Sequence, residues 1–128
     1  MKIKSRLFAI AILGLTLFAL LGCRAKRVPE PSFRSPQIMS ECVMFRYCTR
    51  GATSVSVIGT FNNWQPAGEF EMKKSKSGVW EVCIRLGPGT YEYLFLVDGA
   101  KRMWDPKNRQ RISDRNDVYH SVITVGRY

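Results

Sequence analysis

Short stretches in which apolar and polar side chains alternate recur through most of the chain. Val43, Phe45 and Tyr47 alternate with more polar neighbours, and residues 91–97 follow the same rule without a break. A period of two is typical of a strand that buries one face. Turn sequences such as Gly87-Pro88-Gly89 separate the stretches, and no stretch has the apolar spacing of an amphipathic helix. The sequence therefore predicts an all-β domain, a β-sandwich of about seven strands.

Two regions lack this alternation. Residues 105–119 are charged and polar, and they are predicted to form a long loop before a last strand at residues 121–125. Residues 23–40 contain three prolines and little periodicity, which indicates an extended tether. The predicted folded domain is therefore residues 41–128.

Residues 1–22 have the layout of an export signal. Three basic residues precede an apolar run that is too short for a comfortable membrane span. The run ends in Leu20-Leu21-Gly22-Cys23 and resembles the lipobox of bacterial lipoproteins, in which the cysteine is lipidated and begins the mature chain. An ordinary secretory signal that contains a cysteine by chance is the alternative.

The resemblance to a lipobox implies a lipoprotein of the bacterial cell envelope. Acyl chains on Cys23, palmitate among them, would anchor the protein, because each buried methylene contributes about 0.8 kcal/mol. Arg24 follows the cysteine where an aspartate would favour the inner membrane, so the outer membrane is expected in a bacterium that has one. The tether would then hold the domain off the membrane.

The mature chain would be basic. The full chain has a net charge of +10, and three basic residues but no acidic ones leave with the signal, so the mature charge is +7. Such a charge suits anionic lipids, anionic glycans or nucleic acid. An exported protein rarely meets nucleic acid, and no RNA-binding signature is present. We therefore expect a solvated basic surface with some attraction to membrane, and no nucleic-acid partner.

Three cysteines remain after Cys23. Cys42 and Cys48 flank a predicted strand that would hold them roughly 20 Å apart when extended, too far for a disulfide between them. Cys83 is left as a partner for either one, and because three is odd, no more than one pair can form among them. His120 is the only histidine and no cysteines are closely spaced, so we expect neither a metal nor a cofactor.

Several ordered motifs resemble one known family. They are Gly51-Ala52-Thr53-Ser54-Val55-Ser56-Val57-Ile58-Gly59-Thr60-Phe61-Asn62-Asn63-Trp64, Gly78-Val79-Trp80, Gly87-Pro88-Gly89-Thr90-Tyr91-Glu92-Tyr93, Val97-Asp98-Gly99 and Asp105-Pro106. Together they resemble the glycogen-binding domain, the family 48 carbohydrate-binding module of AMP-activated kinase β subunits. The resemblance covers about residues 41–126 and implies an immunoglobulin-like, early-set β-sandwich that binds α-glucan.

The family's glucan site uses two tryptophans, a lysine and an asparagine. The resemblance places the first tryptophan at Trp64 and makes Trp104 the candidate for the second. The lysine falls on Leu94, which cannot donate to a sugar hydroxyl, and the asparagine falls on His120. Of the four binding side chains, two are thus kept, one is replaced by another polar group, and one is lost.

The candidate residues also suit sugar chemistry directly. A sugar presents a flat patch of C–H groups with a rim of hydroxyls, so an indole can stack on it while amides or ammonium groups take the rim. Asn62 and Asn63 accompany Trp64, and Lys101 precedes Trp104. The alternative for each tryptophan is burial, as a plug beneath its loop or as packing at the end of the sandwich.

Three further side chains receive structural roles. Trp80 alternates with apolar strand residues and is expected in the core. Tyr93 is expected in the core or in a cross-strand pair. Asp98 sits in a turn, and its carboxylate is expected to bond to nearby backbone amides.

No arrangement of residues supports catalysis. Glycoside hydrolysis needs two carboxylates across a cleft, and no acidic residues pair in that way; nucleophile and phosphate motifs are also missing. The sequence predicts a non-catalytic, membrane-anchored module that binds an α-glucan or a related oligosaccharide. The alternative is a structural or protein-interaction domain, with a protein partner in the envelope, that has lost sugar binding. Exposure of Trp64 and Trp104 on one face would separate the two.

Overall fold

The computed structural model describes residues 32–127. The predicted export signal, the predicted lipidation site at Cys23 and residues 23–31 of the predicted tether lie outside the described residues. The strands are β1 (Gln37–Ile38), β2 (Val43–Cys48), β3 (Val55–Gly59), β4 (Lys73–Lys74), β5 (Val79–Ile84), β6 (Gly89–Val97), β7 (Lys101–Met103), β8 (Arg111–Ser113) and β9 (Tyr119–Val125), with a 3-10 turn η2 (Gly68–Phe70). Within this part of the chain, no helix is long and apolar enough to cross a membrane.

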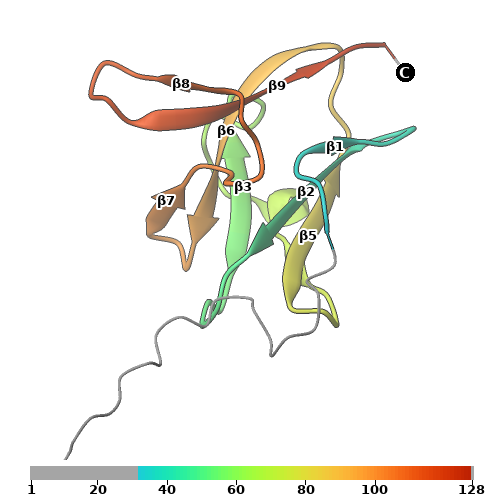
Figure 1. The fold of residues 1–128 in the computed structure, drawn as a ribbon, viewed down its shortest axis with the longest axis vertical. Coiled ribbons are helices and arrows are strands. Elements are labelled where there is room, and N and C mark those ends of the chain that lie inside the picture. The colour runs from blue at the N-terminus through green and yellow to red at the C-terminus, as the bar shows by residue number, and fades with distance from the viewer. Residues whose placement is uncertain (1–31, 128) are drawn as a thin grey trace, which may run out of the picture.

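The strands form two antiparallel sheets, which confirms the predicted β-sandwich (Figure 1). The first sheet has the order β1-β2-β5-β4. The second has the order β3-β6-β9-β8, and β7 is an additional neighbour of β6. On one side β6 pairs with β3, and on the other side it pairs with β9 at its start and β7 at its end. Strand β6 therefore organises the second sheet.

The core lies between the two sheets and is rich in aromatic side chains. The rings of Phe45 and Tyr93 meet edge to face, with centroids 4.9 Å apart, and Tyr47 stacks on Phe95 at 4.7 Å. These residues come from β2 and β6 at every second position, as the alternation predicts. Trp80 is also buried, which confirms its predicted core position.

The structure contains two strands in regions that the sequence assigned to irregular chain. Strand β1 lies in the predicted tether and pairs with β2, and β8 lies in the predicted long loop and pairs with β9. Both strands are short and largely exposed, so they carry no buried alternation that the sequence could have revealed. The count of about seven strands was therefore too low.

The segment before β1 is fixed to the domain as well. Ser35 is buried, and its hydroxyl oxygen accepts a hydrogen bond from the backbone N–H of Arg46 at 3.0 Å. The Lys107 ammonium lies 4.8 Å from the centroid of the Phe33 ring. The folded unit thus begins several residues before the predicted boundary at residue 41.

Asp98 lies in the turn between β6 and β7, and its carboxylate bonds to backbone amides, as predicted. Its Oδ1 accepts hydrogen bonds from the Thr53 N–H (2.7 Å), the Thr53 hydroxyl (2.9 Å) and the Ser54 N–H (3.1 Å). The bonds from Thr53, then the bond from Ser54, lower the pKa of Asp98. The amides belong to a different turn, so Asp98 joins the end of β6 to the start of β3.

One disulfide joins β5 to the residue before β2. The choice that the sequence left open for Cys83 is settled in favour of Cys42, with the two Cα atoms 5.6 Å apart. Strands β2 and β5 are hydrogen-bonded neighbours across six residue pairs. The disulfide therefore cross-links the first sheet, and the long loop that it closes contains β3 of the second sheet.

Asp105 is a fully buried carboxyl group at the end of the sandwich. The Tyr93 hydroxyl donates to its Oδ2 at 2.8 Å and the Lys107 N–H to its Oδ1 at 2.9 Å, and the Ser35 hydroxyl also bonds to it. Burial raises the pKa of Asp105 to about 6, although the hydrogen bonds from Ser35, Tyr93 and Lys107 oppose the rise. Asp105 thus links the N-terminal segment to the core.

Asp105 should make the protein less stable as the pH rises. Its folded pKa of about 6 is above the ordinary value of 3.8, so between these values the folded chain holds a proton that the unfolded chain has lost. The stabilisation from that proton is present near pH 4 and is lost as the pH rises through 6, by about 3 kcal/mol. Urea unfolding of the native chain and of Asp105→Asn, from pH 4 to pH 7, measures this. The prediction is refuted if the difference in unfolding free energy between the native chain and Asp105→Asn stays constant with pH.

Candidate functional site

The loop that carries Trp64 is held in shape by its own side chains and backbone. The Asn62 Oδ1 accepts from the Gly59 N–H at 2.8 Å, and its Nδ2 donates to the Val57 carbonyl at 3.0 Å. The Trp64 N–H donates to the Gly59 carbonyl at 2.9 Å. Asn63 and Trp64 both have positive φ (56° and 58°), a conformation that asparagine tolerates well. Asn62 therefore positions the loop, and its amide is used within the turn.

Gly59 is required at the start of this loop. A Cβ at this position would collide with the carbonyl oxygen of Glu92 and with the Phe61 ring. Because Glu92 belongs to the neighbouring strand β6, any side chain here would push β3 away from β6. The glycine thus allows the loop to begin directly against the sheet.

The Trp64 indole lies on the outer face of the second sheet. It packs against a small apolar cluster of Ile58, Leu94 and Leu96, apart from the core between the sheets. Ile58 and Leu94 are directly opposite each other on β3 and β6. The indole remains partly exposed, so Trp64 is not a plug in the sandwich core. Leu94, which the resemblance placed at the lysine position, supports the indole from below.

His120 lies beside Trp64 on the same face. The two ring centroids are 5.0 Å apart, and the His120 Nδ1 is 3.0 Å from the Glu92 Oε1. The His120 Nε2 is 3.5 Å from the Asp114 Oδ2. Hydrogen bonds from the Val118 and Asn116 backbone lower the pKa of Asp114, which favours its charged form. His120 is thus held between two carboxylates, next to the Trp64 indole.

Trp104 lies on a different face. Its ring meets Tyr119 edge to face, with centroids 5.7 Å apart. Tyr119 and His120 are consecutive in β9, so their side chains point to opposite faces of the strand. Because Trp64 contacts His120 and Trp104 contacts Tyr119, the two tryptophans lie against opposite faces of β9. The two tryptophans therefore do not form one shared exposed face, which is the arrangement that would have favoured a glucan site built on both.

Lys101 does not lie on the Trp64 face either. Lys101 is opposite Val97, whose side chain faces the core, whereas Arg102 is opposite Leu96, which belongs to the Trp64 cluster. Residues that pair directly across two strands point to the same face. Arg102 and Glu92 are therefore the polar neighbours that sequence reasoning missed. Counting alternate positions from Leu94 would have identified Glu92.

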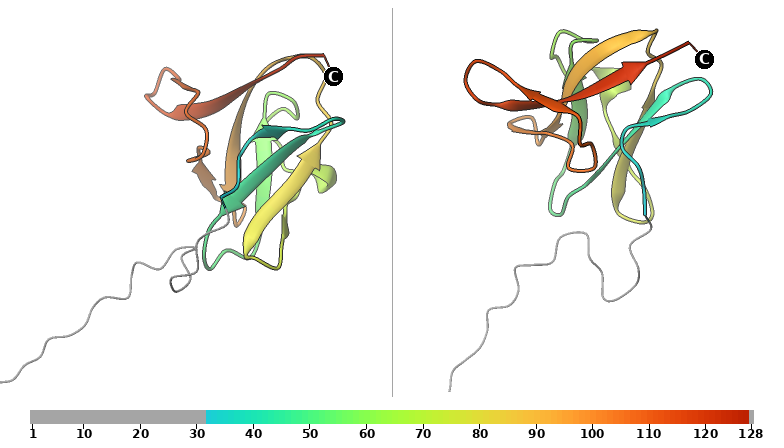
Figure 2. Two further views of the ribbon diagram at one scale, coloured as in Figure 1. Left: turned by 45° about the vertical axis from the view of Figure 1, so that its right-hand side comes forward. Right: turned by 45° about the horizontal axis from the view of Figure 1, so that its top comes forward.

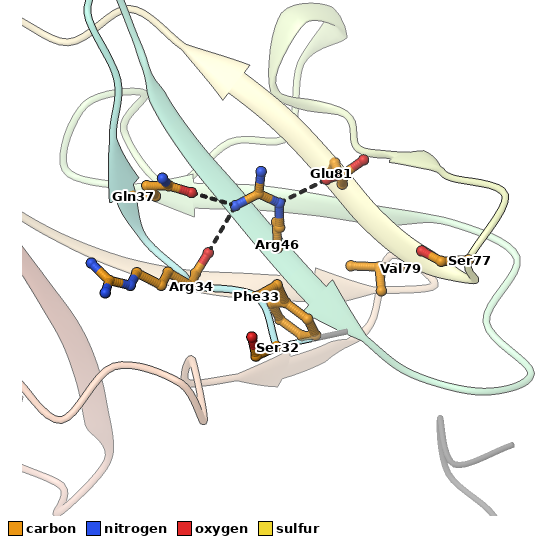
Figure 3. Close-up of a pocket in the computed structure, with 8 residues that line it drawn as sticks. All are labelled: Ser32, Phe33, Arg34, Gln37, Arg46, Ser77, Val79 and Glu81. Carbon is orange, nitrogen blue, oxygen red and sulfur yellow. Dashed lines mark hydrogen bonds and ion pairs between the residues drawn. The ribbon is translucent and has the colours of Figure 1, made fainter. Parts of the chain in front are cut away.

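The hollow around Arg46 on the first sheet does not offer a comparable site. Figure 3 shows the Arg46 guanidinium there, bonded to the Glu81 Oε2 (2.7 Å), the Gln37 Oε1 (2.8 Å) and the Arg34 carbonyl (3.1 Å). These bonds fasten the N-terminal segment to β2 and β5. The hollow, about 370 Å³, is therefore the space left beneath this segment.

The outer face around Trp64 offers the two kinds of chemical group that can bind a sugar. The indole offers an apolar plate, and Glu92, His120 and Arg102 offer acceptors and donors around it. Asn63, which the sequence named, is exposed beside Trp64. Among residues 32–127, no group of three or more histidine, cysteine or acidic side chains could hold a metal ion.

Comparisons with known proteins agree with this chemistry. Residues 42–127 match the family described as the glycogen recognition site of AMP-activated protein kinase. Protein PTST homolog 2, chloroplastic, of Arabidopsis thaliana is 40% identical over 55 residues, which cover 43% of this chain and 10% of that protein. Protein FLOURY ENDOSPERM 6, chloroplastic, of Oryza sativa subsp. japonica is 30% identical over 74 residues, 58% of this chain and 13% of that protein. The match thus spans only about a tenth of these curated relatives.

Proposed function

Since the chain belongs to the family of the glycogen recognition site of AMP-activated protein kinase, we propose that its domain binds α-glucan through the outer face of the second sheet. The observation that carries this proposal is the position of Trp64. Its indole rests on Ile58, Leu94 and Leu96 and stays partly exposed beside His120. A glucose ring can stack on that indole, with its hydroxyl rim toward His120 and Arg102.

The proposed role is recognition without catalysis. Carboxylates that hydrolyse a glycosidic bond flank it from two sides of a cleft. Glu92 and Asp114 instead both approach the two nitrogens of His120, on an open face. They fix the imidazole in place, so that it presents a constant edge to a ligand.

The second candidate function is a protein-interaction domain. Leu94 stands where the family has a lysine, and it is buried beneath Trp64. That replacement removes a hydrogen-bond donor to sugar and enlarges the apolar part of the face, which favours a protein surface as the partner. The two functions differ in whether sugar alone binds.

Titration of the full chain with maltoheptaose, followed by intrinsic tryptophan fluorescence, tests the proposal. A saturable shift supports glucan binding, because Trp64 is the indole nearest the proposed ligand. No shift up to millimolar sugar, from a chain that unfolds cooperatively, would favour the protein-interaction domain.

We also propose that Cys23 carries a lipid anchor in a bacterial envelope, with the outer membrane as the expected location. The support is the sequence Leu20-Leu21-Gly22-Cys23 after a short apolar run. Cys23→Ser should move the protein from the membrane fraction to the soluble fraction and abolish labelling by palmitate. A variant that stays labelled and membrane-bound would exclude lipidation at this residue.

A further inference from the structure

Exposed apolar side chains are found on and next to the hairpin formed by β8 and β9. Six large hydrophobic side chains are exposed among residues 32–127, and four of them lie between residues 104 and 119: Trp104, Ile112, Val118 and Tyr119. The hairpin projects away from the rest of the sandwich, as two views show (Figure 2). Trp104 and Tyr119 lie together, since their rings are in contact, and exposed apolar side chains that lie together mark a contact surface.

Two of these side chains, Trp104 and Tyr119, meet at nearly a right angle around Arg111, and we call this arrangement the corner. The Trp104 and Tyr119 rings are nearly perpendicular, at 83°, and the Arg111 Cζ lies 5.2 Å from the centroid of each ring. Trp104 is 41% exposed and Tyr119 is 45% exposed. The attraction between a guanidinium and aromatic faces holds Arg111 in a defined position.

The donors of Arg111 remain available to a ligand. Within the described part of the chain, its guanidinium makes no hydrogen bond to another side chain or to the backbone and no ion pair. This contrasts with Arg46, whose guanidinium is bonded to Glu81, Gln37 and Arg34. The aromatic contacts of Arg111 orient its planar fork and leave the N–H groups free to bind a carboxylate or a phosphate in bidentate fashion.

The local charge favours an anionic group. The segment from residue 101 to residue 115 contains six basic residues: Lys101, Arg102, Lys107, Arg109, Arg111 and Arg115. Its acidic residues are Asp105, which is buried, and Asp114, which accepts hydrogen bonds from the backbone of its own turn and lies near His120. A ligand that approaches the corner therefore meets a surplus of positive charge.

We propose that Trp104, Tyr119 and Arg111 form a second saccharide site, which takes a sugar unit bearing a phosphate or carboxylate group. The exposed indole stacks on the sugar ring, while the guanidinium binds the anionic substituent. The site lies on the face of β9 opposite Trp64, so it is separate from the proposed glucan surface. The choice of a sugar as the ligand rests on the proposed function; the preference for an anion rests on Arg111.

The test compares polymers that differ only in charge. Affinity electrophoresis of the full chain in phosphorylated amylopectin, and in the same polymer after phosphatase treatment, measures the phosphate preference; an oligogalacturonate competitor measures the carboxylate preference. The native chain should bind the charged polymer more tightly. Arg111→Gln should lose about three- to fivefold in affinity for it and nothing for the treated polymer, as expected for an exposed charge pair.

Arg109→Gln is the matched control, because Arg109 is also exposed, lies two residues away and contacts neither ring. Equal losses in Arg109→Gln and Arg111→Gln would overturn the proposal, since general charge would then explain the binding. A membrane contact would replace the proposal if two results were found together. The chain would bind phosphatidylglycerol vesicles and lose this binding in Arg111→Gln, and it would show no preference between the two polymers.

Trp64→Ala separates this site from the proposed function. If Trp64→Ala still binds the phosphorylated polymer, and if neither protein binds the phosphatase-treated polymer, the second site is supported and the glucan surface is refuted. If binding of the phosphatase-treated polymer depends on Trp64, and if the native chain shows no preference for the phosphorylated polymer, the glucan surface is supported and the second site is refuted.

Discussion

Replacing Trp64 with alanine is expected to lower the affinity for maltoheptaose at least about thirtyfold. A loss of 2 kcal/mol or more is typical when an aromatic side chain at the centre of a binding surface is truncated. Trp64 is such a residue, because among residues 32–127 it is the only indole packed on Ile58, Leu94 and Leu96. Isothermal titration calorimetry measures the effect without depending on the fluorescence of the residue that is removed.

Two further variants make this result interpretable. Trp64→Phe keeps a smaller aromatic plate and should retain part of the affinity. Ile38→Ala removes an exposed apolar side chain from the first sheet and should bind like the native chain. If Trp64→Ala is folded and binds maltoheptaose as tightly as the native chain, the glucan surface is not where we propose it.

Removing the Cys42–Cys83 disulfide is expected to cost about 4 kcal/mol of unfolding free energy. The two residues are 41 positions apart, and cross-linking a loop of that length restricts the unfolded chain by about this amount. The double variant Cys42→Ser, Cys83→Ser, unfolded in urea beside the native chain, measures the difference. A loss that large is a substantial fraction of the stability of a small domain.

The disulfide should matter little for binding. It joins β5 to the start of β2 in the first sheet, whereas Trp64 and His120 lie on the second. Below its unfolding transition, the double variant should therefore bind maltoheptaose like the native chain. A stability loss under about 1 kcal/mol would contradict the expected constraint on the unfolded state.

Local alternation was enough to predict the architecture. Phe45, Tyr93 and Phe95 lie at every second position of their strands, and all three are buried between the sheets. Strands β1 and β8 escaped prediction for the same reason. They are exposed and too short to show a period, and only their pairing with β2 and β9 defines them as strands.

The candidate site depended on register and on the faces of strands, which sequence spacing does not reveal. The choice between Lys101 and Arg102 is decided by the pairing of β7 with β6. Likewise, Trp104 lies away from Trp64 because it meets Tyr119 and not His120. A shift of one residue reverses the face on which a side chain lies, so the motif located Trp64 but not its partners.

The segment from residue 33 to residue 38 has a consequence for how the domain would respond to force. Tension on the chain ahead of this segment meets Arg46 first, since that residue bonds to the Arg34 carbonyl and to the Ser35 hydroxyl. Ser35 also bonds to the buried Asp105. Pulling the segment free would therefore remove a hydrogen bond from a carboxyl group inside the core. A mechanical load on the chain ahead of residue 33 would thus loosen the end of the sandwich as well as this segment.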